Sequence, residues 1–145
     1  AEGAPERIER LVFIDALVPL DGETVAEINQ RPPHNPRDLA VGPSPEEAEN
    51  RGVFHGLDPD MRAWALARYS RHPRRPSDEP LELSKFWSRT WTAHVLRCAQ
   101  ANVPSAAHQQ RTATRLGGTS AEIDADHYAM LSHVDLVADY LLAVT

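Results

Sequence analysis

The sequence predicts an α/β fold built on a parallel sheet of three strands with flanking helices. Short apolar segments at residues 10–15, 93–98 and 119–123 have the length and residue types of buried strands. Helical patterns alternate with these segments, and such an order forms a parallel sheet through right-handed crossovers. Parallel strands are normally covered on both faces and paired with neighbours, so three of them are few for an independent sheet.

The first half of the chain joins one strand to a long helical insertion. The strand RLVFID ends in an acid, and the proline-rich residues 19–43 predict a loop with one short helical turn at 23–30. Ser44-Pro45-Glu46-Glu47 has the pattern of a helix start with a capping box. Asp58-Pro59-Asp60 predicts a second helix start, for a helix that runs to about Ser70 with Met61, Ala65 and Leu66 or Tyr69 on its apolar side.

The second half returns to alternating strands and helices. Residues 73–80 are rich in proline and interrupt the helical pattern before the second strand. Pro104 predicts the start of a helix that ends before Gly117-Gly118, which suits a helix C-terminus. The third strand and the turn DADH then lead to Ser132-His133-Val134-Asp135, which predicts the cap of a last helix. The apolar residues of that helix fall at helical spacing: Val134, Val137, Leu141 and Val144.

Composition excludes several classes of partner. The formal net charge of -6 argues against nucleic acid or an anionic membrane as the main partner. The single cysteine excludes an intrachain disulfide and fits a reducing cytoplasm, which we expect as the compartment. We find no apolar run long enough to span a membrane and no signal peptide. The opening residues AEGAPERIER suggest a processed product or the remainder of a longer chain.

Two polar residues follow strands at the same edge of the predicted sheet. His127 lies directly between a strand and a helix, at the carboxyl edge where open α/β sheets bind ligands. Asp15 ends the first strand at that edge, where an acid can orient a histidine or accept loop amides. The seven histidines show no i, i+4 pair and the chain has no cysteine pair, so we expect no metal site.

Other candidate residues have simpler structural interpretations. Ser105 follows a proline in the first turn of a helix, which indicates a capping role. Cys98, at the end of a strand, is typical of a small buried hydrophobe. Asp126 is a turn former, and both it and Asp124 lie too close to His127 in sequence to orient its ring easily.

Four segments together resemble a known family, the compact α/β-hydrolases of the esterase and hydroxynitrile-lyase kind. RIERLVFIDALVPLDGET resembles the strand and loop that follow their nucleophile helix, and VFHGLDPDMRAWALARYSRHPRRP their cap region. HVLRC with VPSAAHQQRTATRLGG resembles their next strand and helix. AEIDADHYAMLSHVDLVADYLL resembles the catalytic-histidine turn and last helix. The resemblance covers nearly the whole chain and corresponds to the C-terminal part of such enzymes.

The resemblance implies an organisation and an activity. Residues 1–29 and 85–145 would form the core of the fold, and residues 30–84 a helical cap insertion. The enzyme would cleave a small carboxylic ester or related carbonyl compound through a Ser-His-acid triad without a cofactor, with His127 as its histidine. We expect the pocket walls to include Leu17, Trp64, Leu66 and Met130.

The chain departs from the family pattern in three places. It contains no G-x-S-x-G nucleophile motif, which the family carries upstream of the segment that matches residue 1. The loop CAQANVP, where the family normally holds the acid, contains no carboxylate. Asp126 and Val134 replace a glycine and a proline.

These departures leave two hypotheses. Asp15 supplies the acid from the earlier strand, within a hydrogen-bond distance on the order of 3 Å of His127. Alternatively, the triad is lost and the chain is a non-catalytic remnant that serves binding or assembly. In both cases the open edge of the first strand should pair with a second copy or with the upstream part of the fold.

Overall fold

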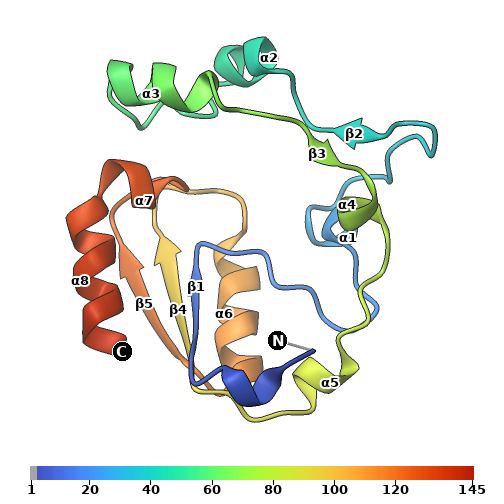
Figure 1. The fold of residues 1–145 in the computed structure, drawn as a ribbon, viewed down its shortest axis with the longest axis vertical. Coiled ribbons are helices and arrows are strands. Elements are labelled where there is room, and N and C mark those ends of the chain that lie inside the picture. The colour runs from blue at the N-terminus through green and yellow to red at the C-terminus, as the bar shows by residue number, and fades with distance from the viewer. Residues whose placement is uncertain (1–2) are drawn as a thin grey trace.

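A parallel sheet of three strands lies at the centre of the chain in a computed structural model that describes residues 3–145 (Figure 1). The strands are β1 (Leu11–Ile14), β4 (Ala93–Cys98) and β5 (Thr119–Ile123), in the order β1-β4-β5. Both pairs are parallel, with Leu11 opposite Ala93 and His94 opposite Thr119. The predicted strands, their direction and their adjacency are therefore confirmed. Residues 1 and 2 lie outside the described residues. They belong to the opening segment AEGAPERIER, for which the sequence suggested a processed product or the remainder of a longer chain.

Most other elements are helical, and a second small sheet lies far from the first. The helices are η1 (Pro5–Arg7), α1 (Val25–Ile28), α2 (Pro45–Asn50), α3 (Pro59–Leu66), α4 (Arg75–Asp78), α5 (Ser84–Trp87), α6 (Ala106–Leu116), α7 (Ala129–Ser132) and α8 (Val134–Val144). The second sheet pairs β2 (Ala40–Val41) antiparallel with β3 (His72–Pro73). None of the helices in residues 3–145 combines the length and apolarity needed to cross a membrane.

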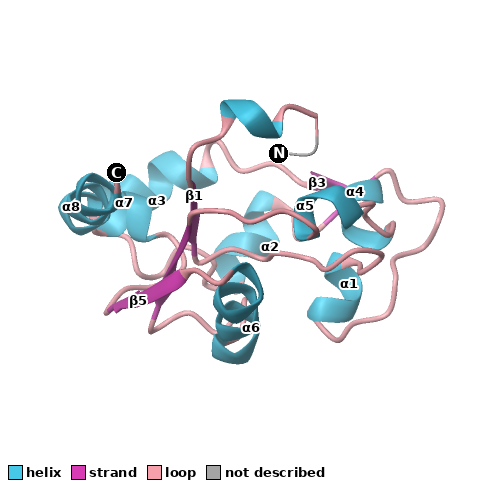
Figure 2. Cartoon of the chain, turned by 90° about the horizontal axis from the view of Figure 1, so that it is seen from below, coloured by secondary structure: helices cyan, strands magenta, loops and turns pink. Residues whose placement is uncertain are grey.

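The main sheet is covered by α6 on one face and α8 on the other (Figure 2). Side chains alternate between the faces of a strand, so neighbouring residues join different clusters. On the α6 side, Ala93 packs with Leu116 of α6. On the α8 side, Cys98 packs with Val137 of α8 and with Ile14 of β1. The buried core thus lies in two layers that hold the three strands between them.

Helix α6 starts two residues later than the sequence predicted. Ser105 is extended, and its hydroxyl accepts a hydrogen bond from the amide of His108, so Ser105 is the N-cap and Pro104 precedes it. This confirms the capping role predicted for Ser105. At the other end Gly117 has a φ of 61°, the left-handed conformation that glycine adopts without steric cost.

The last helix also differs in its first turn. α8 begins at Val134 with His133 as N-cap, and no side chain caps it. Ser132 belongs to α7, and its hydroxyl bonds to the carbonyl of Tyr128 instead of capping α8. Val137 is buried as its spacing predicted, whereas Val134 is 56% exposed because the first turn of α8 lies at the edge of the packed region.

The residues between β1 and β4, which we call the insertion, contain short helices and differ from the sequence expectations in two places. The capping box at Ser44 and the N-cap at Asp58 are present, as the sequence predicted. α3 ends at Leu66 rather than near Ser70, because the amide of Tyr69 bonds to the carbonyl of Leu66 in a tighter turn. The β2–β3 pair and the short helix α4 were not predicted. In Figure 1, α2 and α3 lie beyond the arrowheads of β4 and β5.

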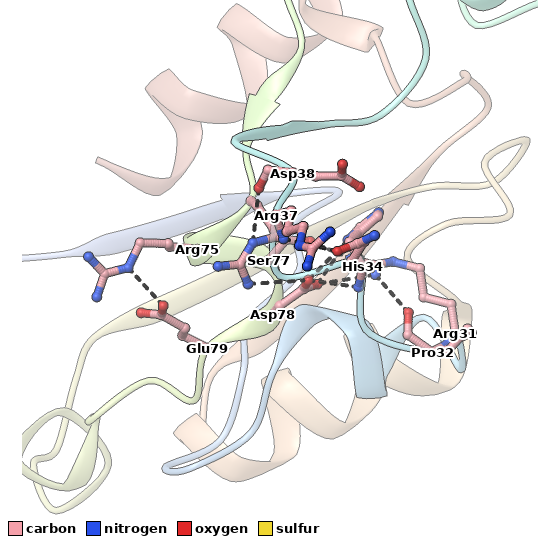
Figure 3. Close-up of polar contacts among 11 residues, drawn as sticks. Arg31, Pro32, His34, Arg37, Asp38, Arg75, Ser77, Asp78 and Glu79 are labelled. Atoms are coloured by element: carbon pink, nitrogen blue, oxygen red, sulfur yellow. Dashed lines mark hydrogen bonds and ion pairs between the residues drawn. The ribbon is translucent and has the colours of Figure 1, made fainter.

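A buried carboxylate holds two parts of this insertion together (Figure 3). The side chain of Asp78 is 3% exposed, and its oxygens accept hydrogen bonds from the amide of His34 at 2.8 Å and from the guanidinium of Arg31 at 3.3 Å. The ring Nδ1 of His34 lies 3.0 Å from the same carboxylate. Ser77 bonds to Arg31 as well. This polar cluster links the loop after α1 to α4.

Candidate active site

The carboxyl edge of the main sheet carries both residues that the sequence singled out. Asp15 follows β1 directly, and its amide still bonds to the carbonyl of Leu96 at 2.7 Å, so the ladder fixes its position. Its φ of 43° lies in the left-handed region, which aspartate tolerates better than most residues but which still costs energy. Such strained residues gather at functional sites, because the surrounding structure must hold them.

Asp15 and His127 form a direct hydrogen bond. Oδ2 of Asp15 lies 2.7 Å from Nδ1 of His127, within the distance that the sequence led us to expect. Oδ1 of Asp15 accepts from the Cys98 amide at 3.2 Å and from Nε2 of Gln109 at 2.6 Å. Asp15 therefore accepts a backbone amide as well, the alternative role considered for it. The Asp15 side chain is fully buried, whereas that of His127 is 47% exposed.

The environment keeps Asp15 ionised at neutral pH. Burial by itself raises the pKa of Asp15, but the hydrogen bonds from His127, the Cys98 amide and Gln109 outweigh it and hold the pKa below its ordinary value. An ionised carboxylate only accepts hydrogen bonds, so Nδ1 of His127 carries the proton. Nε2 bonds to no residue within 3–145, and in the neutral form of the ring it is an acceptor. A neutral histidine in this state can act as a general base.

His127 borders two cavities. One has a volume of about 360 Å³ and is lined by residues 52–53, 55–56, 100–103 and 126–128. The other, of about 420 Å³, lies under α3 and has four aromatic side chains in its wall: Phe54, Trp64, Tyr69 and Tyr128. The resembled family normally holds its acid in the residues after β4. Here residues 100–103 line a cavity beside His127 and supply no carboxylate.

The structure separates the four residues expected in the pocket wall. Trp64 lines the aromatic cavity together with His127. Leu66 packs against the cluster formed by Phe54, Leu57 and Ala65. Leu17 and Met130 line neither of the two cavities beside His127. Leu17 is half-buried in the loop after Asp15, and Met130 is 42% exposed on α7.

Asp126 has a structural role next to the histidine. Its Oδ1 accepts from the amide of Tyr128 at 3.0 Å, which is the turn-forming role that the sequence predicted. Its Oδ2 lies so close to Gly56 that a Cβ there would be 1.8 Å away. A side chain at position 56 would therefore have to displace the Asp126 carboxylate that bonds to Tyr128, so the insertion and the histidine turn are fitted to each other.

The loop after Asp15 is tied to α6 by residues that sequence reasoning missed. Nε2 of His108 accepts from the amide of Val18 at 2.9 Å, and Arg111 binds both carboxylate oxygens of Glu23 at 2.8 and 2.9 Å. Burial, together with the charge of Arg111, lowers the pKa of His108 and keeps its ring neutral for this contact. These bonds anchor the segment that begins with Asp15.

Gln109 was also missed, although the sequence held a signal for it. It is 2% exposed and lies on the buried face of α6 with Ala113 and Leu116, at i, i+4 and i+7. A glutamine buried on a helix face needs a partner, because burial of an unpaired amide is costly. That partner is Asp15, which the sequence alone could not identify.

Two further chemistries were checked at the site. Within residues 3–145 no three His, Cys, Asp or Glu side chains gather closely enough to hold a metal ion. Burial, followed by the charges of Asp15 and Asp126, raises the pKa of the Cys98 thiol to about 11. Cys98 is therefore a buried thiol without thiolate character at neutral pH, as its position in the strand indicated.

Sequence comparisons identify no relative of the chain. No family model matches it. No curated protein matches it either.

Solved structures do resemble it. One is an extracellular α/β-hydrolase from a Paenibacillus species, described as sharing structural and functional homology with tobacco Salicylic Acid Binding Protein 2. It aligns with a TM-score of 0.74 and 19% identity, over 97% of this chain and 63% of its own. Polyneuridine aldehyde esterase aligns with a TM-score of 0.69 and 18% identity over 99% of this chain and 64% of its own. A hydrolase from Pseudomonas aeruginosa aligns with a TM-score of 0.65 and 18% identity, over 98% and 57%.

These alignments establish the fold. They cover nearly the whole of this chain, whereas the chain spans less than two thirds of the length of each solved structure. The chain therefore has the fold of the C-terminal portion of an α/β-hydrolase, as the resemblance in its sequence implied.

Proposed function

We propose that this chain supplies the histidine and the acid of a serine hydrolase that cleaves a small carboxylic ester or related carbonyl compound. The observation that carries the proposal is the bond of 2.7 Å between Asp15 Oδ2 and His127 Nδ1, which leaves Nε2 of a half-exposed histidine beside two cavities. The nucleophilic serine would come from a segment that precedes residue 1. The fold supports this proposal, because its solved neighbours include an esterase and other hydrolases.

The proposed reaction uses His127 twice. Nε2 takes the proton of the serine hydroxyl while the serine oxygen bonds to the carbonyl carbon of the ester. The same nitrogen then returns the proton to the alcohol oxygen as the ester bond breaks and an acyl-enzyme forms. Water repeats both steps and releases the acid. Asp15 stays ionised throughout and stabilises the imidazolium that exists between the two proton transfers.

The substrate would carry an apolar or aromatic group. The aromatic cavity has a volume of about 420 Å³, which is in the usual range for small-molecule sites. Trp64 forms part of its wall, and the proposal extends to Leu17, Leu66 and Met130 as wall residues if closure of the cap brings them nearer. The tested compounds should therefore be short aryl esters.

Replacement of His127 tests the proposal. In a protein that also carries the serine segment proposed to precede residue 1, the His127→Ala variant should lose aryl-ester hydrolysis by about 10³-fold or more, and circular dichroism should report an unchanged fold. His133→Ala is the matched control, since His133 bonds to Ser132 rather than to Asp15. Activity that survives in His127→Ala contradicts the proposal. If the unmodified protein hydrolyses no ester, the non-catalytic hypothesis is favoured instead.

We also propose that the open edge of β1 is an assembly surface. Within residues 3–145 β1 pairs only with β4, so the backbone groups on its other edge have no strand partner. Unpaired edges recruit strands, and the partner would be a second copy or the preceding part of the fold. Light scattering after size-exclusion chromatography tests this, and a stable monomer of the 145-residue chain would contradict it. The single buried cysteine supports a cytoplasmic site of action, which subcellular fractionation would test.

A further inference from the structure

We propose that Gln109 is a positioning residue that fixes the Asp15 carboxylate in the orientation that His127 needs. Its catalytic consequence rests on the proposed hydrolase function, but its effect on His127 can be measured in the chain itself. Nothing in the sequence pattern of the fold assigns this role to a glutamine in α6. It follows from the contacts of one buried side chain.

The two oxygens of Asp15 have different partners. Gln109 Nε2 at 2.6 Å and the Cys98 amide at 3.2 Å both donate to Oδ1. Oδ2 is left for Nδ1 of His127. The two donors to Oδ1 come from α6 and from the end of β4, so together they oppose rotation of the carboxylate. Without Gln109 a single backbone amide would hold Oδ1.

The orientation of the Gln109 amide is dictated by Asp15. If the amide were turned over, its carbonyl oxygen would face the carboxylate, and two acceptors would repel each other. In the observed orientation Nε2 points to Asp15, with the carbonyl of Pro104 as a weaker second acceptor at 3.4 Å. The consequence is that Oε1 is buried and has no hydrogen-bond partner among the described residues. A buried acceptor without a partner lowers the stability of the fold, and Oε1 is such an acceptor in the orientation that lets Nε2 donate to Asp15.

A neutral donor suits this position better than a charged one. The amide of Gln109 orients the carboxylate and stabilises its charge without neutralising it. A lysine or arginine there would form an ion pair with Asp15 and weaken its attraction for the imidazolium of His127. Gln109 is 2% exposed, so water cannot take over the donation when the amide is removed.

The tautomer of His127 reports this positioning directly. In the unmodified chain nitrogen NMR of the imidazole should report a proton on Nδ1, because Oδ2 of Asp15 accepts it. Gln109→Leu fills similar volume and donates nothing. It should raise the ratio of the Nε2-protonated to the Nδ1-protonated form by roughly fivefold, the effect of one ordinary hydrogen bond.

A second variant separates positioning from packing. Gln109→Glu has nearly the same shape, and its protonated carboxyl can donate to Oδ1 as the amide does. Burial beside Asp15 raises the pKa of this glutamate. While this glutamate is protonated, the tautomer ratio of the neutral His127 ring in Gln109→Glu should therefore match the unmodified chain, and it should depart from that ratio once the glutamate ionises as pH rises. Thr112→Val is the matched control, because Thr112 is buried on the same helix and bonds only to the carbonyl of His108.

The outcomes distinguish this inference from the proposed function. An unchanged tautomer ratio in Gln109→Leu, or a ratio in Gln109→Glu that does not depend on pH, overturns the inference even if the protein is an esterase. A changed ratio with no ester hydrolysis in any form supports the positioning role and counts against the hydrolase. If both hold, Gln109→Leu should lower kcat by about 10- to 100-fold while KM changes little, since only the geometry of the acid is disturbed.

Discussion

Within residues 3–145 two buried carboxylates each bond to Nδ1 of a histidine, and they differ in what else surrounds them. Asp15 at the sheet edge bonds to His127 at 2.7 Å, and Asp78 in the insertion bonds to His34 at 3.0 Å. The Asp78 carboxylate also faces the guanidinium of Arg31 at 3.3 Å and that of Arg74 at 3.9 Å. Among residues 3–145 no lysine or arginine lies within 4.0 Å of Asp15.

This difference separates a structural pair from a candidate catalytic one. Two guanidinium groups share the charge of Asp78 with His34, so this charge links separate segments of the insertion. Besides the bond from His127, the described residues that stabilise the charge of Asp15 are neutral donors, the backbone amide of Cys98 and the side-chain amide of Gln109. The charge of Asp15 therefore remains able to stabilise a positive charge on His127. A histidine bonded to an acid is a weak signal for function until the other partners of the acid are known.

The largest expected effect comes from replacing the acid of each pair. Asp15→Asn should lower kcat for an aryl ester by about 10³- to 10⁴-fold, because an amide can donate to Nδ1 and favour the wrong tautomer of His127. Asp78→Asn should change kcat by less than about threefold, since Asp78 lines neither of the cavities beside His127. Steady-state kinetics on both variants measures this. Similar losses in the two variants would refute the distinction between them.

A second comparison concerns the stability of the two regions. Leu96 of β4 is 0% exposed, and Leu96→Ala should lower the free energy of unfolding by about 2–5 kcal/mol through the cavity it leaves. Leu39 in the insertion is 90% exposed, so Leu39→Ala should change the free energy of unfolding by less than about 0.5 kcal/mol. Urea denaturation of both variants measures the difference. A large loss for Leu39→Ala would indicate that another surface covers this residue.

A third prediction concerns pH. The pKa of Asp15 is lower in the folded chain than in the unfolded one, where it is about 3.9. The unfolded state then binds the proton more tightly, so Asp15 contributes stability above about pH 4 that is lost as pH falls through the lower, folded pKa. Asp15→Asn should flatten the dependence of unfolding free energy on pH in this acidic range. An equally steep acid loss in Asp15→Asn would assign the effect to other carboxylates.

The smallest expected effect compares two helix caps. Ser44→Ala at α2 and Ser105→Ala at α6 each remove one capping hydrogen bond, worth about 1 kcal/mol. In the insertion the loss should appear as faster hydrogen exchange confined to α2. At α6 it should lower the stability of the whole sheet, because α6 packs on β4. Hydrogen exchange with mass spectrometry resolves the two patterns, and a global loss from Ser44→Ala would show tighter coupling than we expect.

Local sequence patterns predicted the elements of the core well. The strands and the caps at Ser44, Asp58 and Ser105 depend on residues that are neighbours in sequence. The proximity of Asp15 to His127 was also predictable, because the carboxyl ends of parallel strands meet at one edge of a sheet. Their separation of 112 residues then has little importance.

What the sequence did not reveal depends on contacts between distant segments. The pairing of β2 with β3 involves two residues in each strand, which is too short for a periodic signal. The cluster around Asp78 brings together residues 44 to 47 positions apart. The partner of Gln109 lies 94 residues away on another element. For Asp78 and Gln109 the residue type suggested a polar contact, and only the fold could supply its partner.

The placement of the insertion between two adjacent strands has an evolutionary consequence. β1 and β4 pair directly, so every residue between them forms one closed loop. The entropy cost of such closure grows only with the logarithm of loop length, by about 0.6 kcal/mol for each doubling. Recombination could therefore exchange or resize the segment without dismantling the sheet edge that carries Asp15 and His127. The contact of Asp126 with Gly56 constrains such an exchange: an incoming residue with a side chain at that point would have to displace the Asp126 carboxylate.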